Sequence, residues 1–510
     1  MSEATAERGY DFIVVGAGTA GPVVAHRLTE HPDVRVLVLE AGEAEIPANV
    51  HVPAAWPTLW GTSVDWAYRS IPQPGLNGRE VAEPRGKMPG GTSNLYIMMH
   101  TRGHRSDYDN WAYNGCPGWG YDDVLPYFQR MEDQEDDTNP TAGKGGPIPV
   151  ASAKLHGPNP TSAAFIEACL ELGFPSTDDF NGPYMEGAGW HHVNIKDGRR
   201  HAAWAGYLEP ILDRPNLTLR TGAQATQVLF DGTRCTGVEY VAGGQAQTAY
   251  ATAEVIVCAG AIESPKLLLL SGIGDPAHLA AHGVATRVDL PGVGENFHNH
   301  VLTPVVQEAA QPVPPPNQNC SESALFCKSD PGWTGPDLQI GFVHVAPGLE
   351  NAVTILPGLV RPMSRGWIRL ASSDPLAYPQ VHPNYLGAAA DLDRMVQAVK
   401  LSRDIFATAA FSSWAKQELL PGPDVQTDAD LRVFLRNHTD SYFHLVGSCR
   451  MGLDELSVVD PQLRVYGVEG LRVADASVMP VVPSANCHAG ILMIGERVAD
   501  LLKIEHGLVP

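Results

Sequence analysis

The sequence predicts an α/β protein in which one dinucleotide-binding domain is assembled from separate stretches of the chain and a second, α+β domain is built on an antiparallel sheet. Three observations predict this fold. Near the start, an apolar β-branched run, a glycine turn and a helical pattern follow one another, as in a parallel βαβ unit. The same order returns in the middle of the chain, and a strand and a helix close it. Between these stretches, apolar and polar residues alternate as in antiparallel strands.

The predicted elements follow in order along the chain. The opening unit covers 10–42, and a Gly-, Pro- and Arg-rich loop leading into a helix follows it. A polar stretch with an exposed loop comes next, before strands and helices alternate to the end. These later segments are the polar stretch 113–160, antiparallel strands at 216–244, strand, turn and helix at 253–274, alternating strands over 300–390, helices over 390–438, a strand at 470–480 and a helix at 488–505.

Composition excludes several classes of protein. The chain has 510 residues, 44% hydrophobic and 18% charged, an ordinary globular mixture. Its net charge of −22 repels phosphate backbones and anionic membranes, so we expect no nucleic-acid or membrane partner. The eight cysteines form no CxxC pair, which favours reduced structural thiols in a cytoplasmic protein. The polar start does not resemble a secretory signal, and the oligomeric state is not readable.

A glycine-rich turn is the first chemical signal. Gly16, Gly18 and Gly21 form a GxGxxG pattern directly after a strand and at the start of a helix. Such glycines allow a tight turn, close approach of a pyrophosphate and close helix packing. Glu40 follows 24 residues after Gly16, at the end of the next strand, where an acid binds ribose hydroxyls. The turn predicts an adenine dinucleotide but does not decide between NAD and FAD.

Further stretches match a known family in order. They are "PRGKMPGGTSNLYIMMHTRG" (84–103), "GAIESPKLLLLSGIG" (260–274), "LPGVGENFHNH" (290–300), "HLVGSCRMG" (444–452) and "GLRVADASVMPVVPSANCHAGILMIGERVADLL" (470–502). Together they resemble the glucose–methanol–choline (GMC) family of FAD-dependent alcohol oxidoreductases. The length is similar to that of compact bacterial members such as hydroxymethylfurfural, aryl-alcohol and choline oxidase-like enzymes. The resemblance covers nearly the whole chain.

The resemblance implies a discontinuous FAD-binding Rossmann-like domain and a substrate domain. The implied boundaries are 8–155 for FAD binding with the flavin loop 84–103, 156–215 for part of the substrate domain, 216–300 for FAD binding, 301–440 for the substrate domain and 441–508 for FAD binding with the catalytic histidines. The implied reaction is oxidation of a primary alcohol to an aldehyde, with oxygen as the acceptor and hydrogen peroxide as the product.

The resemblance also assigns roles by position. Gly16, Gly18, Gly21 and Glu40 would hold the ADP half, Val228 would meet the adenine through its backbone, and Asp475 and Ala476 would contact the phosphate and ribitol part. The flavin and pyrophosphate would be lined by Gly90, Gly91 and Thr92. The remaining expected FAD contacts are Thr19, Ala20, Ala41, Asn94, Leu95, Tyr96, Ala259 and His488.

Two histidines near the end of the chain carry the chemistry that the resemblance implies. An alcohol becomes a carbonyl by losing a hydroxyl proton and a carbon-bound hydride, so the protein must supply a base and orient the oxygen. We expect His444 to be the general base and His488 to position the substrate, although either could take the proton. Phe443, with these two histidines, would line the substrate pocket.

The chain departs from the family pattern at a few positions. Tyr96 stands where the family has an Asn that meets the flavin, which changes contacts near the ring. Leu95 stands where some members attach FAD through a histidine, so we expect non-covalent FAD. Asn299 replaces a common Asp and His201 a common Ser, with local effects expected. No metal site is expected, because His191 and His192 lack partners at ligand spacing.

Other functions remain open at this level. An FAD-dependent dehydrogenase that passes electrons to a quinone or another carrier is the main alternative, and a flavin-containing lyase of the same family is a further one. A light-driven decarboxylase, an NAD-dependent dehydrogenase and a non-catalytic flavin module are less favoured. The substrate is open among aryl or furanic alcohols, choline and sugars.

Overall fold

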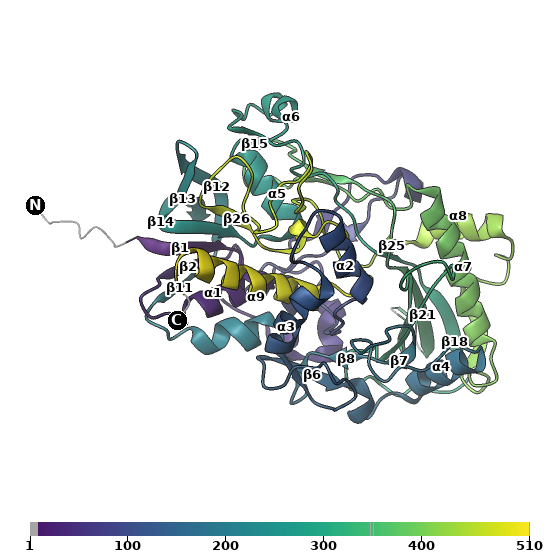
Figure 1. Cartoon of the computed structure of the whole chain (residues 1–510). Coiled ribbons are helices and arrows are strands. Elements are labelled where there is room, and N and C mark those ends of the chain that lie inside the picture. The colour runs from purple at the N-terminus through teal and green to yellow at the C-terminus, as the bar shows by residue number, and fades with distance from the viewer. Residues whose placement is uncertain (1–8, 347, 350, 509–510) are drawn as a thin grey trace, which may run out of the picture.

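The computed structural model describes residues 9–346, 348–349 and 351–508, and it contains two large sheets side by side (Figure 1). The first sheet has seven strands in the order β11-β2-β1-β14-β13-β12, with β26 also paired to β14. Its strands are β1 (Tyr10–Val15), β2 (Val36–Leu39), β11 (Leu217–Arg220), β12 (Ala223–Asp231), β13 (Arg234–Ala242), β14 (Gln245–Val257) and β26 (Leu471–Val473). The predicted α/β class with a discontinuous first domain is therefore confirmed.

Strand β14 joins the two halves of this sheet. Its first half pairs antiparallel with β13, and its second half pairs parallel with β1 and β26. The expectation of antiparallel strands over 216–244 is wrong for β11, which pairs parallel with β2. The reason is that alternation reports which face of a strand is buried and does not report the direction of its partner.

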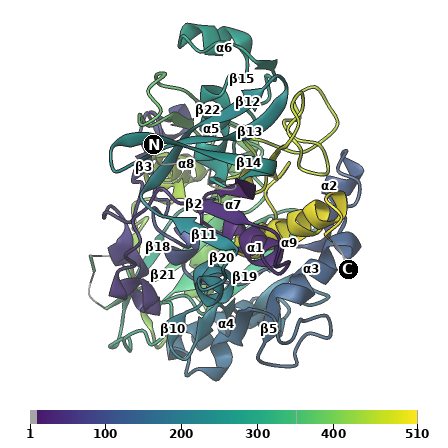
Figure 2. The same ribbon diagram turned by 90° about the vertical axis from the view of Figure 1, so that its left-hand side faces the viewer.

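Three helices accompany the first sheet: the first contacts β1 and β2, the second contacts β12, and the third packs on the first. Helix α1 (Ala20–Leu28) follows β1, α5 (Gly260–Leu270) follows β14, and α9 (His488–Glu505) closes the chain. Figure 2 shows α1 and α9 lying side by side, although they come from opposite ends of the sequence. The closing strand and helix predicted from sequence are both present.

A buried carboxylate joins α9 to the rest of this domain. Glu496 accepts hydrogen bonds of 2.8 Å from the Nε and Nη2 atoms of Arg27 on α1. It also accepts one of 2.6 Å from the Tyr207 hydroxyl and forms an ion pair of 2.8 Å with Arg130. Because α9 begins at His488, this cluster fixes the helix that carries a predicted site residue.

The second sheet is antiparallel throughout. Its eight strands run in the order β24-β18-β21-β20-β19-β7, with β17 beside β21 and β25 beside β17. The strands are β7 (Gly187–Trp190), β17 (Val301–Leu302), β18 (Val305–Ala309), β19 (Ser323–Cys327), β20 (Leu338–Val343), β21 (Ala352–Leu359), β24 (Ala415–Leu420) and β25 (Asp440–Ser441). Helices α4 (Pro160–Glu171) and α7 (Ala389–Phe406) pack on it, and α8 (Asp428–His438) packs on α7 (Figure 1).

Shorter elements connect the sheets. The predicted polar stretch 113–160 contains helix α3 (Tyr121–Met131), because Val124, Phe128 and Met131 form an apolar stripe that is buried. The other short elements are α2 (Arg105–Tyr113), α6 (Pro276–Ala281), β3 (Tyr68–Arg69), β4 (Ala82–Glu83), β5 (Glu132–Gln134), β6 (Ile148–Ser152), β8 (His192–Val193), β9 (Ile195–Lys196), β10 (Arg199–Arg200), β15 (Ile273–Gly274), β16 (Val288–Asp289), β22 (Trp367–Arg369) and β23 (Gln380–His382). The domain boundaries given above stay a prediction.

Several whole-chain features bear on function. All eight cysteines are free and buried. Within the described part of the chain, no helix is long and apolar enough to cross a membrane. The same residues contain no group of three or more His, Cys, Asp or Glu side chains that could hold a metal ion. The imidazole of His192 pairs with Asp136 at 3.1 Å, whereas His191 lies buried beside Phe180.

We predict that Glu496→Leu lowers the free energy of unfolding by about 2–3 kcal/mol, because it leaves two partly buried cations and the buried Tyr207 hydroxyl without their partner. Chemical denaturation followed by circular dichroism would measure this. The matched control is Lys503→Ala on the same helix, which removes a more exposed ion pair with Glu30 and should cost about 1 kcal/mol or less. Equal losses for the two variants would contradict the structural role given to Glu496.

Candidate active site

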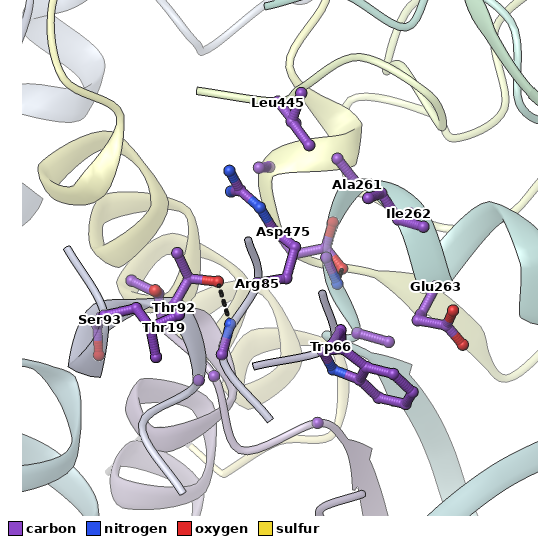
Figure 3. A pocket seen from close by; sticks show the side chains of 18 of the residues that line it. Thr19, Trp66, Arg85, Thr92, Ser93, Ala261, Ile262, Glu263, Leu445 and Asp475 are labelled. Atoms are coloured by element: carbon purple, nitrogen blue, oxygen red, sulfur yellow. Dashed lines mark hydrogen bonds between the residues drawn. The ribbon is translucent and has the colours of Figure 1, made fainter. Parts of the chain in front are cut away.

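One cavity is lined both by the glycine turn of the first sheet and by the two predicted histidines. Figure 3 shows part of its lining. Most of the predicted site residues line it. They are Gly16, Gly18, Thr19, Ala20, Glu40, Ala41, Gly91, Thr92, Leu95, Tyr96, Ala259, Phe443, His444, Asp475, Ala476 and His488. Four predicted contacts do not line it, namely Gly21, Gly90, Asn94 and Val228. In Figure 3, Thr19, Thr92 and Ser93 gather on one side, and Ala261, Ile262 and Glu263 on the other.

The glycine turn fits a pyrophosphate. A Cβ atom added at Gly18 would meet nothing within 4 Å, so the backbone there is open to the cavity. One added at Gly21 would lie 2.0 Å from the Gly16 carbonyl oxygen, so Gly21 packs α1 against the turn and does not face the cavity. The turn therefore leaves room for a ligand at the N-terminus of α1, where backbone amides favour anions.

A second glycine turn contacts the first. Gly91 has φ +49°, and a Cβ atom there would lie 2.7 Å from the Gly18 Cα atom, so only glycine allows this approach. Asn94 donates a 2.8 Å hydrogen bond from its side chain to the Pro89 carbonyl oxygen and so holds the loop rather than lining the cavity. The Thr92 hydroxyl accepts from the Gly86 amide at 3.2 Å, as the dashed line in Figure 3 marks.

Two buried carboxylates shape the nucleotide end. Glu40 accepts hydrogen bonds from the amides of Ala17 at 2.9 Å and Gly42 at 2.8 Å. Burial raises the pKa of Glu40 to about 7. Asp475 accepts from the Gly260 amide at 2.8 Å and the Ser264 hydroxyl at 2.6 Å, which fixes the start of α5. The chemistry of glycine turns, helix N-termini and an acid at the strand end fits an adenine dinucleotide.

The predicted contact of Val228 needs correction. Its amide donates a 2.9 Å hydrogen bond to the Ser271 hydroxyl, and the residue is buried outside the cavity. Ala223, Gln224 and Ala225 of the same strand line the cavity instead. A strand pattern does not show which end of a strand lies at a cavity, and the part of β12 that lines this one comes before Val228.

His444 is held on both sides by its neighbours. Its backbone amide donates a 2.7 Å hydrogen bond to Asn299 Oδ1. The preceding Phe443 has φ +65°, and Arg85 donates a 2.9 Å bond to its carbonyl oxygen. In the ring, Nδ1 lies 2.9 Å from His300 Nδ1, and Nε2 lies 3.2 Å from Asn486 Nδ2.

A buried polar network supports this backbone. Glu83 accepts hydrogen bonds from the Ser441 hydroxyl at 2.6 Å and from the Tyr385 hydroxyl. Asn299 donates to the same two hydroxyls, at 2.8 Å and 2.5 Å. Burial raises the pKa of Glu83 to about 7. Sequence reasoning missed Glu83, Tyr385 and Asn486, and the "GENFHNH" stretch was the only signal for Asn299 and His300.

His488 lies at the first position of α9 and is buried. Neither of its ring nitrogens has a hydrogen-bond partner among the described residues. The Tyr96 ring lies against it, with centroids 4.4 Å apart and planes at 34°, and the Tyr96 hydroxyl donates to Asn194 Oδ1 at 2.5 Å. The imidazole is therefore fixed in place while its nitrogens stay free for a ligand.

Burial sets the charge of both imidazoles. It lowers the pKa of His444 well below the usual value, with smaller contributions from His300 and Arg85. It lowers the pKa of His488 in the same way, with smaller contributions from His100 and Arg200. Both rings are therefore neutral at pH 7 and able to accept a proton.

The wall around the histidines is aromatic and apolar. The rings of Trp56 and Trp60 lie 5.0 Å apart, and Trp60 lies 4.9 Å from Phe443. Leu302 and Leu356 of the second sheet complete it. The acidic residues that line the cavity within the described chain are Glu40, Glu263 and Asp475, and each already accepts hydrogen bonds from protein groups.

Comparisons with known proteins agree with this geometry. Family models of the GMC oxidoreductases match residues 10–302 and 362–495. The mitochondrial choline dehydrogenase of Mus musculus is 39% identical over 97% of this chain and 89% of its own length. The oxygen-dependent choline dehydrogenase of Brucella suis biovar 1 is 38% identical over 96% of this chain and 95% of its own length.

Solved structures give the same result. Pyridoxine 4-oxidase from "Mesorbium loti" superposes with a TM-score of 0.92 at 35% identity, over 98% of this chain and 99% of its own. A fungal aryl-alcohol oxidase superposes with a TM-score of 0.84 at 26% identity, over 98% and 99% of the two chains. The chain therefore belongs to the GMC oxidoreductase family, the FAD-dependent oxidoreductases that act on the CH–OH groups of alcohols.

Proposed function

We propose that this enzyme oxidises a primary alcohol to an aldehyde, with His444 taking the hydroxyl proton and oxygen serving as the electron acceptor. The observation that carries the proposal is a pair of buried, neutral imidazoles facing one cavity that continues to the glycine turn. The part of the cavity at the glycine turn would hold a dinucleotide, and the part at the histidines would hold an alcohol. The enzymes named above as oxidases and as an oxygen-dependent dehydrogenase support oxygen as the acceptor.

The residues of the cavity fit FAD. The Gly18 turn and Thr92 would hold the pyrophosphate, Glu40 the adenosine ribose, and Asp475 and Ala476 the ribitol side. Strand β12 would meet the adenine end near Ala225. When bound, FAD supplies the acceptor for the hydride that leaves the alcohol carbon.

The proton would move to His444 Nε2. An alcohol hydroxyl that enters the cavity would take the place of the 3.2 Å contact with Asn486, and its O–H bond would break as the Nε2–H bond forms. Because burial lowers the pKa of His444, the ring is neutral in the free state and its Nε2 lone pair is available for the proton. His488, whose nitrogens have no partner among the described residues, would hydrogen-bond the same oxygen as it becomes an alkoxide.

The wall of the cavity favours an uncharged alcohol with an apolar or aromatic body. Trp56, Trp60 and Phe443 offer ring faces, and no carboxylate lines this end in the described residues. The guanidinium of Arg85 also lines the cavity and opposes a cationic substrate. Two of the relatives carry choline in their names, so choline is the informative competitor in a test.

The first experiment mixes the purified FAD-loaded protein, without oxygen, with benzyl alcohol, choline, glucose and pyridoxine, and follows flavin absorbance. We expect benzyl alcohol to bleach the flavin fastest and air to restore the colour with release of peroxide. Bleaching without recovery in air would indicate a dehydrogenase that uses a quinone or another carrier. A flavin that no alcohol bleaches would contradict the redox proposal and favour a lyase.

His444→Ala should slow the bleaching by benzyl alcohol about 10²- to 10⁴-fold, the usual contribution of a general base. FAD content should stay that of the parent, because the nucleotide end of the cavity is unchanged. The matched control is His438→Ala on α8, outside the cavity, which should leave the rate within about twofold. A His444→Ala enzyme that is as fast as the control would remove His444 from its role.

We also propose non-covalent FAD. Leu95 lines the cavity on the loop after Gly91 and offers no nucleophilic atom for a bond to the flavin. Acid precipitation of the loaded protein should therefore leave all of the yellow flavin in the supernatant, where absorbance measures it. Flavin that stays in the washed pellet would show that another side chain forms a covalent bond.

A further inference from the structure

His300 makes a contact with the proposed base that the sequence did not suggest. It is fully buried, and its Nδ1 atom lies 2.9 Å from His444 Nδ1. The two rings are nearly perpendicular, with planes at 83° and centroids 5.0 Å apart. His300 is not among the residues that line the cavity, so it acts on a substrate only through His444.

The contact of His444 with Asn486 also bears on which ring nitrogen carries the proton. Gln339 Nε2 donates a 3.2 Å hydrogen bond to Asn486 Oδ1, which sets the orientation of the Asn486 amide. The amide nitrogen of Asn486 then faces His444 Nε2 at 3.2 Å and can only donate. With the Asn486 amide in this orientation, His444 Nε2 is the acceptor and the proton of the neutral ring lies on Nδ1.

This tautomer makes His300 an acceptor. The His444 Nδ1–H group points at His300 Nδ1, so His300 carries its own proton on Nε2, an atom that has no hydrogen-bond partner among the described residues. The reverse arrangement would leave a proton on His444 Nε2 facing the N–H of Asn486, two donors without an acceptor. Burial lowers the pKa of His300 to about 3, so the ring is neutral and offers a lone pair.

We propose that His300 is the positioning residue of the base: it accepts the Nδ1–H of His444 and keeps the Nε2 lone pair directed at the alcohol. The inference rests on the proposed function of His444. During the reaction the alcohol O–H bond breaks, the Nε2–H bond forms, and His444 becomes an imidazolium. Its Nδ1–H stays hydrogen-bonded to His300, and this bond strengthens as the ring gains charge. His300 thus stabilises the imidazolium form of His444 that exists once the proton has been transferred.

The first test measures the tautomer directly and needs no substrate. Nitrogen-15 NMR of the holoenzyme with labelled histidine, with His444 assigned by the loss of its signals in His444→Ala, reports which ring nitrogen carries the proton. We expect Nδ1–H in the parent and in His300→Asn, whose amide oxygen replaces the His300 Nδ1 acceptor. We expect a mixture or the Nε2–H form in His300→Leu. An Nε2–H form in the parent would overturn the proposal.

The second test measures the rate of flavin bleaching by benzyl alcohol. His300→Leu should slow it about ten- to a hundredfold, the effect of one hydrogen bond to a charged group, while the apparent Kd for the alcohol changes little. His300→Asn should recover most of the rate. The matched control is His191→Leu, a buried imidazole outside the cavity, which should leave the rate unchanged.

A double variant separates positioning from a general structural effect. In a His444→Ala background, His300→Leu should cause no further loss of rate, because the group through which it acts is gone. Multiplicative losses, or an equally slow His300→Asn, would overturn the role. If no alcohol reduces the parent enzyme, the proposed function fails while the NMR result still decides the His300–His444 bond.

Discussion

The parallel pairing of β26 with β14 is the contact on which the rest of the site depends. It sets Leu471–Val473 beside Val255–Val257 in the middle of the first sheet, more than two hundred residues away along the chain. Asp475 follows at once and fixes the start of α5 through the Gly260 amide. The chain then reaches His488 and α9, which packs on α1. A histidine that lines the cavity near the end of the sequence thus belongs to a helix that packs beside the glycine turn near its beginning.

The polar groups around His444 fall into two sets, those that are hydrogen-bonded within the protein and those that face the cavity. Two groups away from the cavity are satisfied: Glu83 accepts two hydroxyl bonds, and Asn299 uses both ends of its amide. Buried polar atoms are costly unless paired, so this network gives His444 one defined position. At the cavity, the two ring nitrogens of His488 have no hydrogen-bond partner in the part of the chain that the structure describes, so they are available to a ligand. A site of this kind gives up some stability in exchange for chemistry.

Similarity along the chain and the lining of the cavity carry different information. The relatives share the fold, the glycine turn and the order of motifs over nearly their whole length. In the proposed function, substrate choice would depend on a few side chains that line the cavity with the histidines, among them Trp60, Phe443 and two leucines of the second sheet. Because function lies in such sites and not in the fold, identity of this degree defines the reaction class better than the substrate.

The sequence by itself determined the family, the α/β class, the glycine turn and the two histidines that line the cavity. These features are local: a strand, a turn and a helix start occupy adjacent residues, and the order of motifs needs no three-dimensional information. Only the tertiary structure decided which groups face one another. The contact of His300 with His444, the role of Glu83 and the exclusion of Val228 from the cavity all depend on side chains from distant segments meeting at one point. Sequence pattern and propensity show which face of a segment is buried. They do not show which side chain from a distant segment will contact that face.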